Sequence, residues 1–251
     1  MEPILLYGFP AGSSMGLVAA FERLGLPYRL CRVDMLADMK NEAYAGINGR
    51  QETPVLITGE GKVLTETMAI AAWLEARDTQ RRISFDPRTP EADRMHQLVA
   101  FVNTGFTAAF MPLWAALEMA SPDPVLQATL RDFGRKAVAE RHDQLEEMIN
   151  GTELLAGDRL TLADTTLIGV ARWAEFHQAI EGADYPRLAA LRRRIEAVPE
   201  RACRREWRNA CRFGRLPGAC PAGRGDRPLR GLIHDAPLVN GPAPAWLAPP
   251  E

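Results

Sequence analysis

The sequence lacks the features that mark disulfide-rich, membrane and secreted proteins. Four cysteines in 251 residues are too few for a disulfide scaffold, and the three beyond residue 200 lack the CxxC spacing of a zinc site. Apolar runs fall well short of the roughly 20 residues that span a bilayer, so we expect no membrane protein. The first residues have no basic region and too short an apolar run for a signal peptide, which predicts a cytoplasmic protein.

Motifs for several common enzyme classes are missing as well. The chain contains no GxSxG, HExxH, Walker or GxGxxG pattern. Its histidines form no metal-ligand pair, and His142, in the run Glu140-Arg141-His142-Asp143, is expected on a solvated helix face. We therefore expect no metal centre.

Charge is nearly balanced over the whole chain, with a net charge of −2, but its distribution is uneven. Residues 201–251 hold nine Arg, no Lys and four acidic residues, whereas residues 1–200 carry a net charge of −7. The acidic main body argues against nucleic-acid binding. The last residues are also rich in Gly and Pro, so we expect 201–251 to be a poorly ordered, solvated tail, with contact to an acidic partner as the alternative.

The first eighty residues alternate between strand and helix signals. Short apolar runs predict four strands, and apolar residues at helical spacing predict two helices, the first capped by Ser13 and ended at Gly25. In chain order these segments are 4–7, 14–24, 28–33, 53–58, 62–65 and 66–76. A helical crossover makes the first two strands parallel, and a tight turn makes the last two antiparallel. The order βαβ-ββα predicts a small mixed sheet covered by helices.

Strand signals vanish beyond Pro90, where only helical patterns follow. These patterns cover residues 91–120, 124–149, 162–180 and 186–197. The predicted fold class is therefore α/β followed by all-α. Its predicted parts are an α/β domain over residues 1–79, a linker over 80–89, an all-α domain over 90–200 and the tail over 201–251.

The stretch 7–14 reads as a strand that ends in a loop opening a helix. Helix N-termini present unpaired N–H groups and positive potential, and a serine hydroxyl there can donate a hydrogen bond to a bound thiolate. Lowering a thiol pKa from about 8.5 to about 6.5 needs roughly 2.7 kcal/mol. One charge-assisted hydrogen bond of about 1.5–3 kcal/mol together with a helix terminus can supply this. The alternative is that Ser13 only caps the helix.

Two further junctions offer ligand contacts. If the Thr53-Pro54 peptide bond is cis, the Thr53 N–H and C=O can pair with an extended ligand backbone. At the strand-to-helix junction, the Glu66 carboxylate can take the ammonium of an amino-acid head group, while Thr67 and the helix terminus take its carboxylate. The alternative is that Glu66 and Thr67 only start the helix, with Thr67 as its cap.

A fourth motif, Thr161-Leu162-Ala163-Asp164, matches the S/T-x-x-D capping box before an apolar helix. In this box the threonine and the acid each bond to the other residue's backbone. We interpret it as a folding signal and not as a catalytic one.

Taken together, in this order and spacing, these motifs resemble the cytosolic glutathione transferase family over about residues 3–200. The resemblance rests on Thr53-Pro54, Glu66-Thr67 and the capping box. It implies an N-terminal thioredoxin-like glutathione-binding domain, an all-helical C-terminal domain and a homodimer. Glutathione would be the co-substrate.

The opening is most similar to the bacterial beta-type enzymes of this family. Tyr7 and Pro10 match, and Ser13 falls on the family cysteine. Thr107 and Ala108 stand where those enzymes usually carry His and Lys near glutathione. Mixed-disulfide chemistry on a cysteine is therefore not expected, and a serine that stabilises the glutathione thiolate fits better.

The resemblance implies attack of glutathione thiolate on a small hydrophobic electrophile. Ser13 would donate to the thiolate, with Ser14 as the alternative. Thr53 would pair with the cysteinyl backbone and Pro54 would hold the turn, while Glu66 and Thr67 would bind the γ-glutamyl group. The remaining assignments are Arg50 or Gln51 to the glycine carboxylate, and Phe9, Phe106, Phe110, Met111 and Trp114 to the electrophile. This last set is equally what a packed core needs.

Two other functions stay open at this point. A non-catalytic binding or regulatory protein of the same fold is favoured by the missing His and Lys and by the basic tail. A specialised glutathione-dependent dehalogenase, isomerase or ether-cleaving enzyme would carry the same motifs, and only a substrate screen would separate it from a general transferase.

Overall fold

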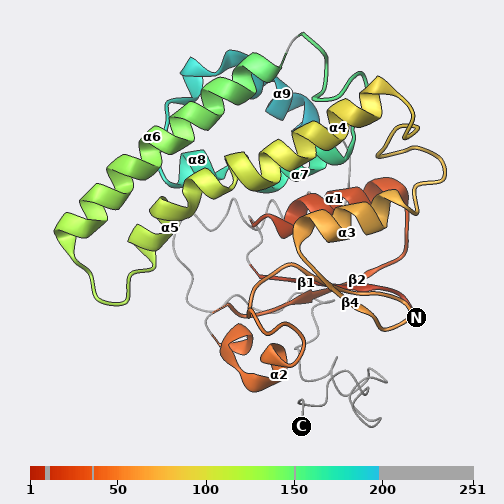
Figure 1. The fold of residues 1–251 in the computed structure, drawn as a ribbon, viewed down its shortest axis with the longest axis horizontal. Helices are drawn as coiled ribbons and strands as arrows, with labels where there is room; N and C mark the ends of the chain where they lie inside the picture. Colours follow the sequence, from red (N-terminus) through yellow and green to blue (C-terminus); the bar gives the residue numbers. More distant parts are fainter. Residues whose placement is uncertain (9–11, 36, 150, 198–251) are drawn as a thin grey trace.

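The computed structural model describes residues 1–8, 12–35, 37–149 and 151–197. The predicted tail and Phe9 lie outside these residues. Within them, a four-stranded sheet carrying helices on both faces is followed by a group of helices that lies beyond one face of the sheet (Figure 1).

The strands form one mixed sheet in the order β2-β1-β3-β4. Their bounds are β1 Ile4–Tyr7, β2 Arg29–Arg32, β3 Val55–Ile57 and β4 Val63–Thr65. β1 pairs in parallel with β2 across the crossover helix α1 (Ser14–Leu24), and β3 pairs antiparallel with both β1 and β4. The predicted mixed sheet and its βαβ-ββα order are confirmed.

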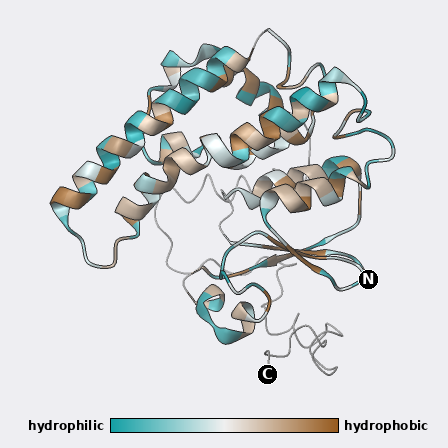
Figure 2. Cartoon of the chain, viewed as in Figure 1, coloured by the Kyte–Doolittle hydropathy of each residue, from teal (hydrophilic) through white to brown (hydrophobic). Residues whose placement is uncertain are grey.

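The two faces of the sheet are covered by different helices (Figure 1). α1 and α3 (Thr67–Glu75) cover one face, and the 3₁₀ turn η1 (Asp38–Lys40) with α2 (Glu42–Ala45) covers the other. Side chains of a strand alternate between faces, so Leu5 joins the core beneath α1, while Leu6 joins the core on the η1 and α2 side. Figure 2 shows hydrophobic residues along the strands, with hydrophobic and hydrophilic residues mixed on the helices at either side.

The second part of the described chain is all-helical. Its elements are α4 Pro90–Ala100, the π-helical turn η2 Phe101–Phe106, the 3₁₀ turn η3 Ala108–Phe110, α5 Met111–Leu117, α6 Pro124–Met148, α7 Leu162–Val170, α8 Trp173–Phe176, η4 Gly182–Asp184 and α9 Pro186–Ala197. The four predicted helical patterns are therefore present, although the third one divides into α7 and α8. The predicted domain boundaries stay a prediction, with α3 and α4 on either side of the expected linker.

One helical stretch contradicts the expectation that every apolar segment is too short to cross a membrane. The stretch Pro90–Leu117 is 28 residues long and, by length and composition alone, apolar enough to do so. Core helices pass the same test. Met95, Leu98 and Val102 of this stretch are fully buried against the rest of the fold, which accounts for much of its apolar character.

The segment between α3 and α4 is bonded to both halves of the described chain. The buried Asp78 carboxylate accepts from the N–H groups of Arg82 and Ile83 at 2.7 and 2.8 Å. Arg82 Nη1 donates to the Leu24 carbonyl at the end of α1, and the Ile83 carbonyl accepts from the Leu162 N–H at the start of α7. The segment therefore ties α1 to α7.

His142 contradicts its predicted place on a solvated helix face. Its side chain is 2% exposed, and its ring lies 4.6 Å from the ring of Phe106 and 5.2 Å from that of Tyr185. Burial lowers the pKa of His142 to about 4, so the ring is neutral near pH 7 and Nδ1 donates to the Val138 carbonyl at 2.7 Å. The charged neighbours in sequence lie on other faces of α6, and α9 with η2 covers this one.

Candidate functional site

Three chain segments leave the sheet at the same end. In the strand register, Leu6 of β1 lies opposite Val55 of β3, and Val55 lies opposite Thr65 of β4. β1 and β4 both run antiparallel to β3. The residues after Leu6, those before Val55 and those after Thr65 therefore emerge together. This brings the three predicted ligand-contacting junctions together at one end of the strands, which we call the junction edge.

Ser13 lies at the N-terminus of α1 but does not cap it as predicted. Its backbone is already helical, with φ −53° and ψ −29°, and its side chain makes no capping hydrogen bond. A capping residue needs an extended backbone to turn its oxygen toward the helix N–H groups, and Ser13 does not have one. Its hydroxyl is thus not used to cap the helix, and the residue is partly exposed, whereas Ser14 is only 3% exposed.

The Thr53-Pro54 peptide bond is cis, as the resemblance implied. Thr53 lies against the end of β1, with its Oγ1 3.1 Å from where a Cβ on Gly8 would stand. Within the described part of the chain, its backbone N–H and C=O make no hydrogen bond. Two backbone groups are therefore free to bind a ligand at the junction edge.

The N-cap of α3 lies one residue earlier than predicted. Glu66 occupies the N-cap position of α3 and Thr67 the first helical position, so the predicted cap at Thr67 is wrong. Glu66 has φ 69° and ψ 127°; its carbonyl accepts from the Ile70 N–H of α3, but its side chain makes no capping hydrogen bond. Such a backbone is costly for a residue with a Cβ, and residues held this way cluster at binding and catalytic sites.

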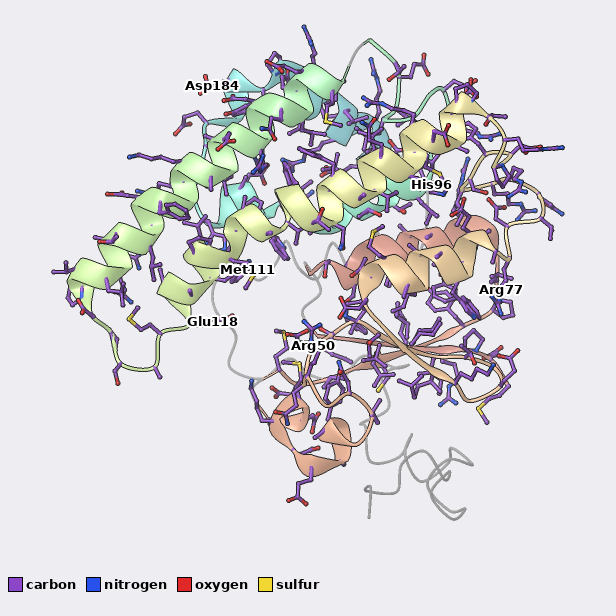
Figure 3. All side chains as sticks on the ribbon, in the orientation of Figure 1. Arg50, Arg77, His96, Met111, Glu118 and Asp184 are labelled. Carbon is purple, nitrogen blue, oxygen red and sulfur yellow. The ribbon has the colours of Figure 1, made fainter. Side chains whose placement is uncertain are left out.

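Arg50 lies at the same edge, between two carboxylates. Its Nη1 is 2.8 Å from Glu66 Oε1, and its Nη2 is 2.9 Å from Glu52 Oε2. All three side chains are more than half exposed, so solvent screens these pairs. Figure 3 shows Arg50 on the side of the sheet that faces the helical part of the molecule. Gln51 is half-buried and has φ 54°.

Two buried side chains that the sequence did not single out as a pair hold this loop. Tyr44 Oη and Asn48 Nδ2 both donate to the Glu52 carbonyl, at 2.7 and 2.9 Å, and Asn48 Oδ1 accepts from the Arg50 N–H. Burial raises the pKa of Tyr44, which keeps its hydroxyl protonated as a donor. In the sequence, the signal that could have identified this support is Tyr44, an aromatic residue with a hydroxyl group within a polar loop.

The predicted electrophile contacts fall into two groups. Phe106 and Phe110 are buried and pack on each other with ring centroids 5.8 Å apart, as core side chains do. Met111 is 62% exposed and lies on the side of α5 turned toward the sheet (Figure 3). Trp114 is half-buried, and its ring stacks on Phe176 with centroids 5.4 Å apart.

The capping box is present and fully internal. Asp164 is 0% exposed, and its carboxylate accepts from the Thr161 N–H and Oγ1 and from the Leu155 N–H, at 2.8, 2.9 and 2.9 Å. Burial raises the pKa of Asp164 against the opposing effect of these bonds. These bonds fix the start of α7 and tie it to the preceding loop at Leu155, so the role of Asp164 is structural, as predicted.

Metal ligation has no geometric support in the part of the chain that the structure describes, where no group of three or more His, Cys, Asp or Glu side chains is placed to hold an ion. Cys31 forms no disulfide within these residues, and it is buried within the sheet. The described residues at the junction edge offer hydroxyl, carboxylate, guanidinium and backbone groups.

The fold and the junction edge define a class of protein, a thioredoxin-like domain with a helical domain appended to it. Two family models, described as the N-terminal and the C-terminal domain of glutathione S-transferase, match residues 14–77 and 110–199. The chain belongs to the glutathione S-transferase family. The resemblance noted from the sequence and the predicted fold class are both confirmed.

Similar proteins come from several bacteria. Glutathione S-transferase GST-4.5 of Xanthomonas campestris pv. campestris is 27% identical over 186 residues, which cover 74% of this chain and 88% of the relative. A glutathione transferase structure from Methylococcus capsulatus has a TM-score of 0.72 at 24% identity, covering 84% of this chain and 100% of its own. A sphingomonad glutathione S-transferase solved with glutathione has a TM-score of 0.70 at 22% identity, covering 81% and 98%. The structural likenesses establish the fold.

Proposed function

We propose that the protein is a glutathione transferase that joins glutathione thiolate to small hydrophobic electrophiles. The observation that carries this proposal is the Ser13 hydroxyl, which α1 leaves unused and which lies at the same sheet edge as the free Thr53 backbone and the strained Glu66. Membership of the glutathione S-transferase family supports glutathione as the co-substrate.

Glutathione would bind along the junction edge in an extended form. The Glu66 carboxylate takes the ammonium of the γ-glutamyl group, and Thr67 with the N-terminus of α3 takes its carboxylate. Thr53 N–H and C=O pair with the cysteinyl backbone in the manner of a strand, while Pro54 fixes the turn that presents them. Arg50, with Gln51 beside it, supplies a donor for the glycine carboxylate.

Ser13 is the better candidate for the thiolate donor. Ser13 is partly exposed and its hydroxyl makes no capping hydrogen bond, whereas Ser14 is buried inside α1. A pKa lowered from about 8.5 to about 6.5 would raise the thiolate fraction at pH 7 from roughly 3% to roughly 75%. The thiol proton passes to solvent, and the thiolate sulfur forms the new bond to carbon as the leaving group departs.

The helical part would supply the electrophile contacts. Met111 is exposed on the side of α5 that faces the sheet, and Trp114 follows one turn later with part of its ring exposed. An apolar electrophile held there would lie close to the thiolate, so catalysis comes from placing the two reactants together and from stabilising the thiolate. A cytoplasmic homodimer with a detoxifying role belongs to the same proposal.

One observation favours a non-catalytic binding protein as the second candidate. Thr107, at the position where related enzymes carry a histidine, donates its hydroxyl to the Val102 carbonyl of its own helix at 2.7 Å. Neither Thr107 nor Ala108 can then supply a charge to the bound glutathione.

The test is glutathione affinity by calorimetry together with conjugation rate against pH, for wild type, Ser13→Ala and Ser14→Ala. We expect Ser13→Ala to bind glutathione, to lose activity about 10- to 100-fold and to raise the apparent thiol pKa, because about 1.5–3 kcal/mol of thiolate stabilisation is removed. Ser14→Ala is the matched control and should keep the wild-type activity and the wild-type apparent thiol pKa. Absence of glutathione binding by folded wild type would leave only the non-catalytic protein.

A further inference from the structure

The backbones of α1 and α7 touch where the two helices cross. A Cβ on Gly169 of α7 would stand 2.8 Å from the Ser13 carbonyl oxygen and 3.0 Å from the Gly16 nitrogen. A Cβ on Gly16 of α1 would collide with the Thr165 carbonyl of α7. Only glycine allows helices to approach this closely, so each helix carries one at the crossing.

The contact falls on the hydrogen bond that begins α1. The Ser13 carbonyl accepts from the Gly16 N–H at 3.2 Å, and Gly169 packs against both of these groups. Ser13 itself has helical φ and ψ, so its side-chain direction follows from the position of this first turn. Any movement of the Ser13 carbonyl therefore moves the hydroxyl as well.

The α7 side of the crossing is held firmly. Every residue from Leu162 to Val170 is buried, and the N-terminus of α7 is fixed by the Asp164 carboxylate and by the bond from the Leu162 N–H to the Ile83 carbonyl. α1 is buried from Ser14 to Phe21, whereas Gly12 and Ser13 just before it are partly exposed. When atoms are added at the crossing, this first turn at Gly12 and Ser13 is therefore the part that can shift.

We propose that Gly169, which lies in the helical part and far from the sheet in sequence, is a positioning residue for Ser13. The inference rests on the proposed function, since it concerns the hydrogen bond from Ser13 to the thiolate. Such a bond weakens steeply when the hydroxyl no longer points at the sulfur. The helical part thereby sets the strength of thiolate stabilisation through backbone contact alone.

The test is Gly169→Ala, with the pH dependence of kcat/KM and the affinity for glutathione as readouts. We expect the apparent thiol pKa to rise by about one unit and kcat to fall about tenfold, with the glutathione Kd changed less than about threefold. The affinity is spared because Thr53, Glu66 and Thr67 lie on other segments. Gly182→Ala is the matched control, since a Cβ there meets nothing within 4 Å, and it should behave as wild type.

A double-mutant cycle separates positioning from general damage. If Gly169 acts through Ser13, Gly169→Ala causes no further rise in the thiol pKa when Ser13 is already Ala. An equal rise in both backgrounds would overturn the inference, as would a folded Gly169→Ala protein with the wild-type pH profile. Gly16→Ala crowds the same crossing from α1, and failure of both variants to fold would assign the contact to packing and overturn the positioning role.

The outcomes also separate this inference from the proposed function. If wild type binds glutathione and Ser13→Ala raises the thiol pKa but Gly169→Ala does not, only the inference about Gly169 fails. If wild type does not bind glutathione, or if Ser13→Ala leaves the thiol pKa unchanged, the proposed function fails with it.

Discussion

The N-termini of α3 and α7 carry the same residue types, a threonine and an acid, and use them in opposite ways. At α7, Asp164 is buried and accepts three hydrogen bonds from Thr161 and Leu155. At α3, the Glu66 side chain is exposed and makes no capping hydrogen bond to its own helix, and its φ is 69°. The residue types are alike, but the two sites differ in exposure. The site at Asp164 is closed, because its carboxylate is buried, and the site at Glu66 is open, because its carboxylate faces solvent.

This difference teaches where a polar group serves the fold and where it can serve a ligand. A buried carboxylate with every bond made inside the protein has nothing left for a second molecule, and removing it leaves buried donors without partners. An exposed carboxylate on a strained backbone contributes little to folding. The remaining structure must hold it in place, which is the arrangement expected of a binding group.

The largest expected effect lies at the closed site. Asp164→Ala leaves the buried N–H groups of Thr161 and Leu155 without acceptors, so the free energy of unfolding should fall by about 3–5 kcal/mol. Urea denaturation measures this. Asp164→Asn keeps one acceptor oxygen and should lose less, whereas a loss below about 1 kcal/mol in the Ala variant would remove the distinction between the two helix starts.

The second prediction concerns His142, which like Asp164 is buried and hydrogen-bonded inside the protein. Its pKa is lowered to about 4 in the folded protein, against 6.5 for the free side chain, so the unfolded chain binds the proton first as the pH falls. The free energy of unfolding should therefore decrease by about 3 kcal/mol between pH 6.5 and pH 4 because of this one group.

Urea denaturation at several pH values measures the His142 contribution. His142→Phe removes the titrating ring and should flatten the acid side of the curve relative to wild type. Tyr185→Phe keeps the ring that packs on His142 and should retain the wild-type slope, because the pKa of Tyr185 is about 12 and does not enter this range. Parallel curves for wild type and His142→Phe would contradict the prediction.

The third prediction concerns the open site. Glu66→Gln should weaken glutathione binding about 10- to 100-fold, because a charge-assisted bond to the γ-glutamyl ammonium of about 1.5–3 kcal/mol is lost. The free energy of unfolding should change by less than about 0.5 kcal/mol, as at exposed positions generally. Calorimetry gives the affinity, and Glu52→Gln, which also removes a partner of Arg50, is the matched control that should bind normally.

The smallest effect is expected at Arg50. Both of its ion pairs are exposed to solvent, so Arg50→Gln should change the free energy of unfolding by less than about 1 kcal/mol. A larger loss in urea denaturation would show that the Arg50–Glu66 pair is part of the folded framework and would bring the two helix starts closer together in character.

Much of the fold could be predicted from the sequence because it depends on local periodicity. The strand and helix segments, the parallel and antiparallel pairings and the capping box at Thr161 and Asp164 were all found where expected. Apart from the apolar stretch Pro90–Leu117, the errors concern polar side chains. Ser13 does occupy the predicted N-cap position but makes no capping hydrogen bond, and the N-cap of α3 is Glu66 and not Thr67. Capping depends on the backbone angles of one residue, which periodicity does not report.

His142 shows the same limit at longer range. Its neighbours in sequence are charged, but its environment is made by Phe106 and Tyr185, which approach from other elements. The close crossing at Gly16 and Gly169 was missed for the same reason, since a glycine inside a helix gives no sign of the backbone that it faces.

By itself, the sequence determined the elements, their order and the motifs that resemble glutathione transferases, because hydrophobic spacing and turn residues act over a few positions. Tertiary structure alone decided which of these polar groups are spent inside the protein and which stay open. Burial and hydrogen-bond satisfaction depend on partners far apart in the chain. Glu66 and Asp164 differ because residues distant in sequence cover Asp164 and leave Glu66 exposed.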